Sequence, residues 1–254
     1  MSNTFYAPGE QRAAKVGDLF AAIARHYDLI NDLQSFGLHR FWKRRVVELA
    51  QIQNGNRALD LCCGTGDIAL ALARRGAETT GLDFSEKMLA VAQSRFENSK
   101  FKIQNLKFIQ GDAQQIPFAE NSFDIVTVGY GLRNLTSWEK GLEEMFRVGK
   151  PGARLIVLEF GKPASALWRK LYFAHLKCSV PLIGLLFCGN ARAYAYILES
   201  LKHYPAQQAV AQKMRELKLE NVRVINFLGG AMAVNYGEKR KSAGLQESGR
   251  RDSN

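Results

Sequence analysis

The chain has 254 residues, 46% of them hydrophobic and 23% charged, with a formal net charge of +11. This length and composition fit one large soluble domain with a full core, and they exclude a disordered chain, a collagen and a disulfide-stapled miniprotein. The four cysteines form no C-x-x-C pair and have no histidine at zinc-ligand spacing, so we expect reduced thiols in a cytoplasmic protein and no metal site. Residues 1–12 have no apolar core after a basic start, so we expect no secretory signal.

The N-terminal region, residues 1–56, is predicted to be helical. Apolar residues recur at helical spacing over residues 11–26, and a second helix is predicted over residues 39–52.

From residue 57 to residue 160, short apolar runs alternate with helical segments. The predicted strands are residues 57–61, 78–83, 106–112, 123–131 and 153–160. The predicted helices are residues 67–75, 85–96 and 136–150, with Ser85 and Thr136 as N-caps and Pro151–Gly152 ending the last helix. Near-continuous apolar strands joined by helices predict a parallel sheet that is covered on both faces.

Beyond Phe160 the alternation stops. Two or three helices are predicted over roughly residues 164–217, and two strands then meet at Gly229–Gly230. The polar tail, residues 238–254, is expected to be disordered. The sequence contains no internal repeat, so a single α/β domain is the simplest interpretation.

The excess positive charge lies mostly in one stretch. Residues 161–218 contribute +7 of the net +11, whereas residues 57–160 are neutral. The same stretch contains the apolar run 178–188, which is too short for the roughly 20 residues that span a bilayer. This combination favours a surface that meets anionic lipid or an apolar substrate, with a buried helix bearing a solvated basic face as the alternative. We do not expect nucleic-acid binding, because basic and aromatic residues are not interleaved along a stripe.

A glycine-rich turn follows the first predicted strand. Gly64 and Gly66 allow the backbone to turn sharply and approach a ligand closely. With Ala69 they satisfy the dinucleotide fingerprint G-x-G-x-x-G/A, which by itself does not distinguish a nucleotide site from a tight turn.

Acidic residues mark the ends of three predicted strands. Asp60 ends the first strand, and Asp83 ends the second, where a carboxylate can accept hydrogen bonds from both ribose hydroxyls. Proteins that bind NAD share that feature. Asp112 ends the third strand, where it can accept from an adenine amino group, while the small Ala113 leaves room for the ring.

Together these features resemble the class I S-adenosylmethionine-dependent methyltransferases over residues 57–160. The resemblance rests on the acid before the glycine turn, the second-strand acid, and G-D-A followed by P-F and F-D. It implies an α/β, Rossmann-like class I methyltransferase fold, with a seven-stranded mostly parallel sheet, a reversed C-terminal strand and helices on both faces. It also implies S-adenosyl-L-methionine as cofactor, bound by Gly64, Thr65, Gly66, Asp83, Asp112 and Ala113. One departure is Cys62, which replaces the family's first turn glycine, so we expect Cys62 to adopt a negative φ.

Two further motifs narrow the resemblance. They are Y-D-x-x-N-D at residues 27–32 and G-L-R-N at residues 131–134. With them, nearly the whole chain resembles the ubiquinone/menaquinone biosynthesis C-methyltransferase family, which methylates a ring carbon of a prenylated quinol. The resemblance implies conversion of demethylmenaquinol to menaquinol, with a benzoquinol of ubiquinone biosynthesis as the alternative acceptor. The family's His-Arg-Gly triplet near the end is replaced by Asn235-Tyr236-Gly237.

The proposed chemistry suggests roles for particular side chains. A sulfonium methyl group is already activated, so the enzyme must align the ring carbon and activate it. We expect Arg133 to stabilise the phenolate, directly or through a water that acts as base, and Asn134 or Asn31 to hold the second ring oxygen. Tyr27 and Asp28 are expected to close the site. His26 and His39 are less favoured as bases, because a lone histidine near a helix end is more often structural.

The resemblance divides the single domain by role. Residues 1–56 would close the active site, residues 57–160 would bind the cofactor, and residues 161–237 would lie on the substrate side. The expected partners are the prenylated quinol and, peripherally and reversibly, the anionic cytoplasmic face of a membrane, with a homodimer left open. The competing hypotheses are an NAD-dependent oxidoreductase and a non-catalytic basic module that binds RNA or membrane.

Overall fold

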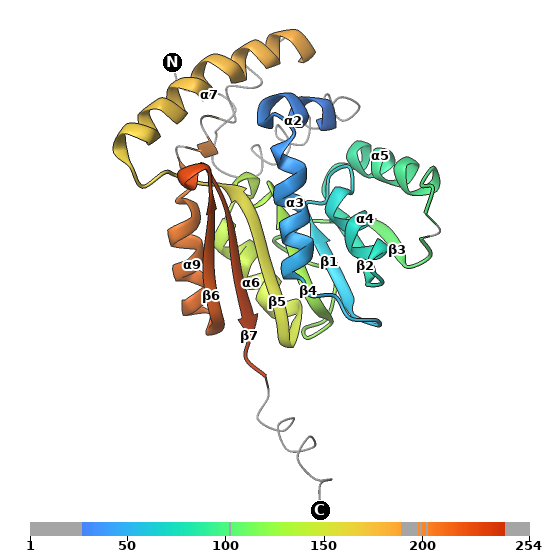
Figure 1. Cartoon of the computed structure of the whole chain (residues 1–254). Helices are drawn as coiled ribbons and strands as arrows, with labels where there is room; N and C mark the ends of the chain where they lie inside the picture. The colour runs from blue at the N-terminus through green and yellow to red at the C-terminus, as the bar shows by residue number, and fades with distance from the viewer. Residues whose placement is uncertain (1–26, 102, 189–197, 199, 202, 242–254) are drawn as a thin grey trace, which may run out of the picture.

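A computed structural model describes residues 27–101, 103–188, 198, 200–201 and 203–241 (Figure 1). The side chains of residues 180 and 182–188 are also outside this description. The helix predicted over residues 11–26, His26 and most of the polar tail therefore lie outside the described residues. So do the side chains of most of the apolar run 178–188.

Seven strands form one sheet in the order β3-β2-β1-β4-β5-β7-β6. The strands are β1 (Arg57–Leu61), β2 (Glu78–Asp83), β3 (Leu106–Gln110), β4 (Phe123–Gly129), β5 (Gly149–Phe160), β6 (Leu219–Phe227) and β7 (Met232–Lys239). Strands β1 to β5 pair in parallel, whereas β7 is antiparallel to both β5 and β6. The predicted mostly parallel sheet with a reversed C-terminal strand is therefore confirmed.

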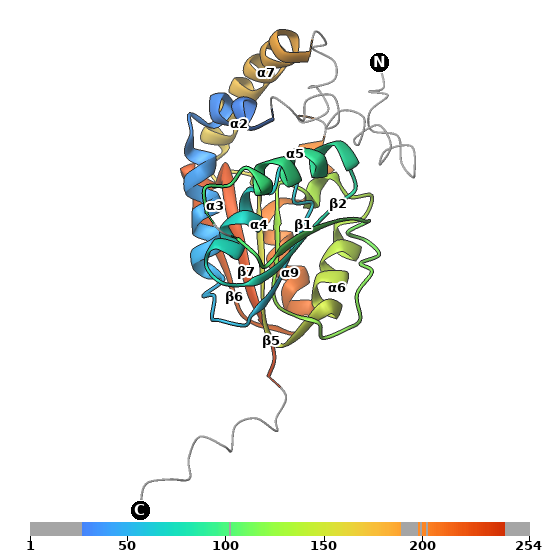
Figure 2. The ribbon, with the colours of Figure 1, turned by 90° about the vertical axis from the view of Figure 1, so that its right-hand side faces the viewer.

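Helices cover both faces of the sheet (Figures 1 and 2). On one face, α3 (Leu38–Leu49) and α4 (Asp67–Arg74) bury Trp42, Val46 and Leu72 against Ile156 and Val234. Helix α5 (Glu86–Glu97) packs beside α4 at the β2–β3 edge. On the other face, α6 (Trp138–Val148) and α9 (Ala206–Glu216) form a second apolar layer with the sheet. Both layers are apolar, which explains why the strands read as continuous apolar runs.

Several predicted boundaries were wrong by a few residues. The N-cap of α6 is Ser137 rather than Thr136, because the Ser137 hydroxyl accepts from the Lys140 N–H at 3.1 Å. Pro151 and Gly152 do not end α6; they lie inside β5, where the pairing with β4 is irregular. Ser85 does precede α5, but its side chain makes no capping hydrogen bond. Strand β7 continues to Lys239, into the segment expected to be disordered, because it pairs with β6 there.

Two helices lie beyond the carboxyl end of the sheet, at the top of Figure 1. They are α2 (Tyr27–Ser35) and α7 (Ala166–Cys188), which meet around Ile30 and Leu176. Leu176 is the one described side chain of α7 that is buried. Among the described residues, no helix is both long enough and apolar enough to cross a membrane.

Candidate active site

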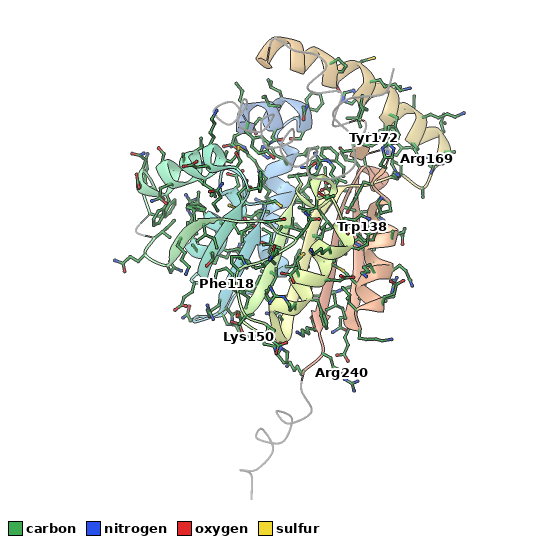
Figure 3. The ribbon with its side chains drawn as sticks, turned by 180° about the vertical axis from the view of Figure 1, so that it is seen from behind. Phe118, Trp138, Lys150, Arg169, Tyr172 and Arg240 are labelled. Atoms are coloured by element: carbon green, nitrogen blue, oxygen red, sulfur yellow. The ribbon has the colours of Figure 1, made fainter. Side chains whose placement is uncertain are left out.

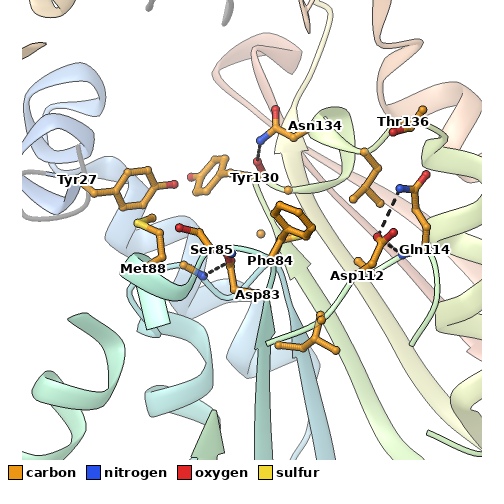
Figure 4. Close-up of a pocket in the computed structure, with 18 residues that line it drawn as sticks. Tyr27, Asp83, Phe84, Ser85, Met88, Asp112, Gln114, Tyr130, Asn134 and Thr136 are labelled. Atoms are coloured by element: carbon orange, nitrogen blue, oxygen red, sulfur yellow. Dashed lines mark hydrogen bonds between the residues drawn. The ribbon is translucent and has the colours of Figure 1, made fainter. Parts of the chain in front are cut away.

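A cavity opens at the carboxyl ends of β1, β2 and β4, beneath α2 (Figure 4). We call it the cofactor cavity. Its lining includes the glycine turn, the end of β2 and the start of α5, the segment 111–114, and the loop after β4. These segments converge because the carboxyl ends of parallel strands share one edge of the sheet.

Asp83 lies in this cavity with a fixed orientation. Its Oδ2 accepts from the Gly64 N–H at 2.8 Å, and its Oδ1 accepts from the Ser85 N–H at 2.9 Å. Burial raises the pKa of the carboxyl group, an effect that the two N–H donors oppose. Each carboxylate oxygen can accept more than one hydrogen bond, so both retain capacity toward the cavity. This arrangement suits a ligand that presents two adjacent hydroxyls.

Asp112 and Ala113 line the opposite side of the cofactor cavity. The Asp112 Oδ1 accepts from the Gln114 N–H at 2.8 Å, which fixes the carboxylate at the start of its loop. Ala113 is buried, and its methyl group occupies little of the space beside Asp112. A flat heteroaromatic ring with an exocyclic amino group fits these features.

The glycine turn contributes unequally to the lining. Gly64 lines the cavity and adopts φ +55°. Thr65 is buried behind it and donates its hydroxyl to Asp28 at 2.9 Å. Gly66 begins α4 at φ +83°, where a Cβ would lie 3.0 Å from the Phe108 ring. Thr65 and Gly66 therefore shape the turn from behind, while Gly64, Asp83, Asp112 and Ala113 face the cavity.

The expectation of a negative φ at Cys62 was wrong. Cys62 adopts φ +50°, the left-handed conformation that a glycine would occupy without strain. Such a conformation costs a non-glycine residue about 1–2 kcal/mol. The neighbouring Gly131 makes room for it, because a Cβ at Gly131 would lie 2.3 Å from the Cys62 Cβ. Burial raises the pKa of the Cys62 thiol well above its usual range, so the side chain stays protonated and packs as an apolar group.

Asp60 does not line the cofactor cavity but fixes the turn from below. Its Oδ2 accepts from the Ala69 N–H at 3.0 Å, and its Oδ1 accepts from the Thr127 hydroxyl at 2.7 Å. The carboxyl group thus ties β1 to β4 and to the first turn of α4. Burial raises its pKa to about 7, although both donors act in the opposite direction.

Ion pairs hold α2 over the cofactor cavity. Arg95 of α5 donates to Asp28 at 3.0 Å and to Asp67 at 2.5 Å, and Lys43 of α3 reaches Asp67 at 2.6 Å. The preceding residue, Tyr27, lines the cavity. Tyr27 therefore lies at the cofactor cavity, and Asp28 lies beside it in contact with Arg95 and Thr65.

Arg133 is buried beneath the loop after β4. Its Nη1 donates to Glu159 at 2.7 Å and to the Tyr130 carbonyl oxygen at 2.8 Å, and its guanidinium lies 4.8 Å from the Phe160 ring centroid. Arg133 does not appear in the lining of the described cavities. Its neighbour Asn134 does line the cofactor cavity, and its Nδ2 donates to the same carbonyl at 3.1 Å.

A second cavity, which we call the apolar groove, lies between α2, α3, α7 and the 3-10 turn Leu228–Gly230. Trp42, Phe160, Leu171 and Leu176 contribute much of its lining. Asn31 and Gln34 also line it with buried side-chain nitrogens. The Gln34 Nε2 has no hydrogen-bond partner in the described part of the chain, whereas Asn31 interacts with the Tyr27 hydroxyl. The groove therefore offers amide donors inside an apolar wall.

His39, the less favoured candidate base, also borders this groove. Its Nε2 contacts Asp32 Oδ1 at 2.8 Å, and burial lowers the pKa of its ring.

Sequence reasoning missed several residues that line the site. Ser85, Met88 and Gln114 line the cofactor cavity, Gln34 lines the groove, and Tyr130 lines both. Each of these residues lies close in the sequence to a predicted site residue, namely Asp83, Asp112, Asn31 or Arg133. That proximity was the one signal that could have indicated them. The direction of each side chain depends on local backbone angles that the sequence pattern does not carry.

Comparisons with known proteins agree with this geometry. The sequence model described as the ubiE/COQ5 methyltransferase family matches residues 9–239. The chain is 41% identical over 235 residues to the ubiquinone/menaquinone biosynthesis C-methyltransferase UbiE of Azotobacter vinelandii, covering 91% of this chain and 92% of that protein. It is 41% identical over 234 residues to the demethylmenaquinone methyltransferase of Desulfitobacterium hafniense, with the same coverage.

Solved structures show the same fold. A SAM-dependent methyltransferase from Thermotoga maritima aligns with a TM-score of 0.57 at 19% identity, covering 86% of this chain and 99% of that one. Another, from Aquifex aeolicus, aligns with a TM-score of 0.53 at 17% identity, covering 77% and 88%. These likenesses identify the class I methyltransferase fold.

Proposed function

Since the chain belongs to the ubiE/COQ5 methyltransferase family, we propose that it methylates a ring carbon of a prenylated quinol. The chain is an S-adenosyl-L-methionine-dependent methyltransferase, which sets aside both the NAD-dependent oxidoreductase and the non-catalytic module. We propose demethylmenaquinol as the acceptor. A benzoquinol of ubiquinone biosynthesis is the alternative acceptor, because relatives of both descriptions match this chain equally well.

The cofactor cavity fits the methyl donor. We propose that Asp83 accepts the ribose hydroxyls, that Asp112 accepts from the adenine amino group, and that Gly64 allows close approach of the backbone. The bound donor supplies a methyl group on a sulfonium, which needs no further activation. Asp83 and Asp112 then serve to place that group, and the small Ala113 leaves space for the adenine ring.

The apolar groove carries the proposal for the acceptor. A prenylated quinol has a long apolar tail and a ring with two oxygens. The groove supplies apolar walls and buried amide donors at Asn31 and Gln34, which match both parts of that molecule. The groove reaches the cofactor cavity at Tyr130, so the ring would meet the methyl donor there.

Arg133 takes a positioning role in this proposal. Glu159 neutralises its guanidinium at 2.7 Å, which weakens its field at the groove. The same guanidinium holds the Tyr130 carbonyl, which Asn134 also contacts. Arg133 would therefore act by fixing the loop that carries Tyr130 and Asn134, rather than by contacting the phenolate.

The experiment is incubation of the protein with labelled methyl donor and chemically reduced demethylmenaquinone, followed by mass analysis of the lipid. A parallel reaction uses the reduced benzoquinol. Methylation should require the reduced form, because the oxidised quinone has no hydroxyl to deprotonate and an electron-poor ring. If neither quinol gains a methyl group, or if quinone and quinol react equally, the proposed acceptor chemistry is wrong.

We also propose that the mouth of the groove rests on an anionic membrane surface. Exposed apolar side chains surround it, with Phe36 84%, Leu167 70%, Leu171 55% and Leu228 52% exposed. Arg169, Lys170 and Lys177 are exposed on α7 beside them. A cation near anionic lipid contributes about 1 kcal/mol, and the apolar rim would reach the acyl boundary.

The membrane proposal predicts salt-sensitive binding to phosphatidylglycerol vesicles. Changing Arg169, Lys170 and Lys177 to Glu should weaken that binding and raise KM for the long-tailed quinol only. The matched control changes Lys107, Arg215 and Arg240 to Glu, the same change of charge; in Figure 3, Arg240 lies at the opposite end of the molecule from Arg169. Equal sedimentation of the wild type and both variants would refute the proposal. A concentration-dependent dimer that hides the rim would instead make this face a homodimer interface.

A further inference from the structure

Tyr130 lies where the two cavities meet. Among the described residues, it is the one shared by the linings of the cofactor cavity and the apolar groove. It directly follows β4, and its side chain is 8% exposed. The Tyr130 side chain therefore borders both a ligand in the groove and a ligand in the cofactor cavity.

The Tyr130 hydroxyl is buried and has no hydrogen-bond partner in the part of the chain that the structure describes. Leaving such a group unpaired costs free energy of folding. Burial also raises the pKa of this hydroxyl well above 10, so it stays protonated and remains a hydrogen-bond donor. In Figure 4 the side chains of Tyr130 and Tyr27 point toward one another across the cavity.

The backbone of Tyr130 is fixed from both sides. Its N–H donates to the Leu158 carbonyl at 2.8 Å, and its carbonyl accepts from Arg133 at 2.8 Å and from Asn134 at 3.1 Å. The residue adopts φ +61°, which is unfavourable for a bulky side chain. Backbone strain at a residue held this firmly is common at functional sites. These hydrogen bonds thus hold Tyr130 in a position where its unpaired hydroxyl lowers the stability of the fold.

We infer that the Tyr130 hydroxyl donates a hydrogen bond to a ring oxygen of the acceptor beside the methyl donor, and so stabilises the phenolate oxygen as it forms. This inference rests on the proposed function and adds a residue to it. Tyr130 transfers no proton in this role. The hydrogen bond from the buried Tyr130 hydroxyl strengthens as the acceptor oxygen becomes negative.

The test replaces Tyr130 with Phe, which keeps the ring and removes the hydroxyl. We expect kcat/KM for the reduced quinol to fall by about 10- to 100-fold, with little change in affinity for the methyl donor. The urea midpoint of unfolding should stay the same or rise, since an unpaired buried hydroxyl is lost. The pH at which kcat rises should also move upward, because the bound quinol hydroxyl becomes harder to deprotonate.

The matched control is Tyr236→Phe in β7, outside the linings of both cavities. The Tyr236 hydroxyl donates to Glu238, so its removal should lower the urea midpoint and leave turnover unchanged. Opposite outcomes in the two variants would separate catalysis from folding.

The inference would be overturned if Tyr130→Phe kept wild-type kinetics and pH profile. It would also be overturned if the variant lost activity because it bound the methyl donor more weakly, or because it was less stable. If the wild type itself methylates no quinol, the proposed function fails first, and the donor titration shows whether the cofactor cavity still binds.

Discussion

The cofactor cavity and the apolar groove hold their polar groups differently. In the cofactor cavity, Asp83 and Asp112 receive backbone N–H donors from loops at the ends of β2 and β3. In the groove, Asn31 and Gln34 project buried amide nitrogens, and the Gln34 Nε2 has no partner among the described residues. The carboxylates of the cofactor cavity are therefore oriented by backbone donors, whereas the proposed acceptor would satisfy the free donor of the groove.

The supports of the two cavities differ in the same way. The cofactor cavity lies on paired strands with buried residues on both faces. The groove depends on α2 and α7, which lie off the sheet, and α2 is tied down by the partly exposed pair Asp28–Arg95. Changes at the sheet should therefore affect folding and donor binding, whereas changes at the groove-lining residues of α2 should mainly affect the acceptor.

The largest effect is expected at the Arg133–Glu159 pair. Both side chains are about 95% buried, so Arg133→Ala leaves an unpaired buried carboxylate and should cost about 3–5 kcal/mol of stability. The double variant Arg133→Ala with Glu159→Ala should recover part of that loss, because neither charge is left alone. Urea unfolding of the four proteins measures the coupling. Fully additive losses would show that the pair is not the source of the stability.

The next effect is a pH dependence that arises from Asp60. Its pKa is about 7 in the folded protein and near 3.8 in the unfolded chain, so between these values the folded state binds the proton more tightly. Its contribution to stability is therefore lost as the pH rises from about 4 to about 7, by on the order of a few kcal/mol. Asp60→Asn should remove this dependence. Urea unfolding of both proteins across that range should give curves that diverge; parallel curves would contradict the prediction.

A smaller effect is expected for Asp83→Ala. Charge-assisted hydrogen bonds contribute about 1.5–3 kcal/mol each, so affinity for S-adenosyl-L-methionine should fall at least about tenfold. Titration calorimetry measures it, with far-ultraviolet circular dichroism as the check that the fold is retained. KM for the quinol should change little. Unchanged donor affinity would mean that Asp83 does not hold the ribose.

The smallest effect is expected for Asp28→Asn on α2. The pair with Arg95 is about one-third exposed, and such pairs contribute at most about 1 kcal/mol. KM for the quinol should rise by about two- to fivefold. Donor affinity should fall by less, because Tyr27 is the residue of α2 that lines the cofactor cavity. Glu48→Gln, which breaks an exposed pair on α3, is the control. A larger effect on the donor than on the quinol would contradict the division between the two cavities.

The alternation of apolar strands and helices was enough to predict the sheet, and the acids at strand ends predicted much of the cofactor cavity. Both are local properties, because parallel strands place their carboxyl ends at one edge whatever the loops do. Asp83, Asp112 and Ala113 therefore lie where the sequence predicted. The resemblance to the quinone C-methyltransferase family is confirmed by the comparisons.

Tertiary structure decided the rest. Cys62 adopts φ +50° because Gly131, 69 positions further along the chain, leaves room for its side chain. Arg133, which the motif predicted to stabilise the phenolate, is paired with Glu159 on β5 in a buried ion pair. Tyr130 joins the two cavities because its strained backbone turns its ring between them. Each outcome depends on a contact between distant segments, and the spacing of residues along the chain does not record such contacts.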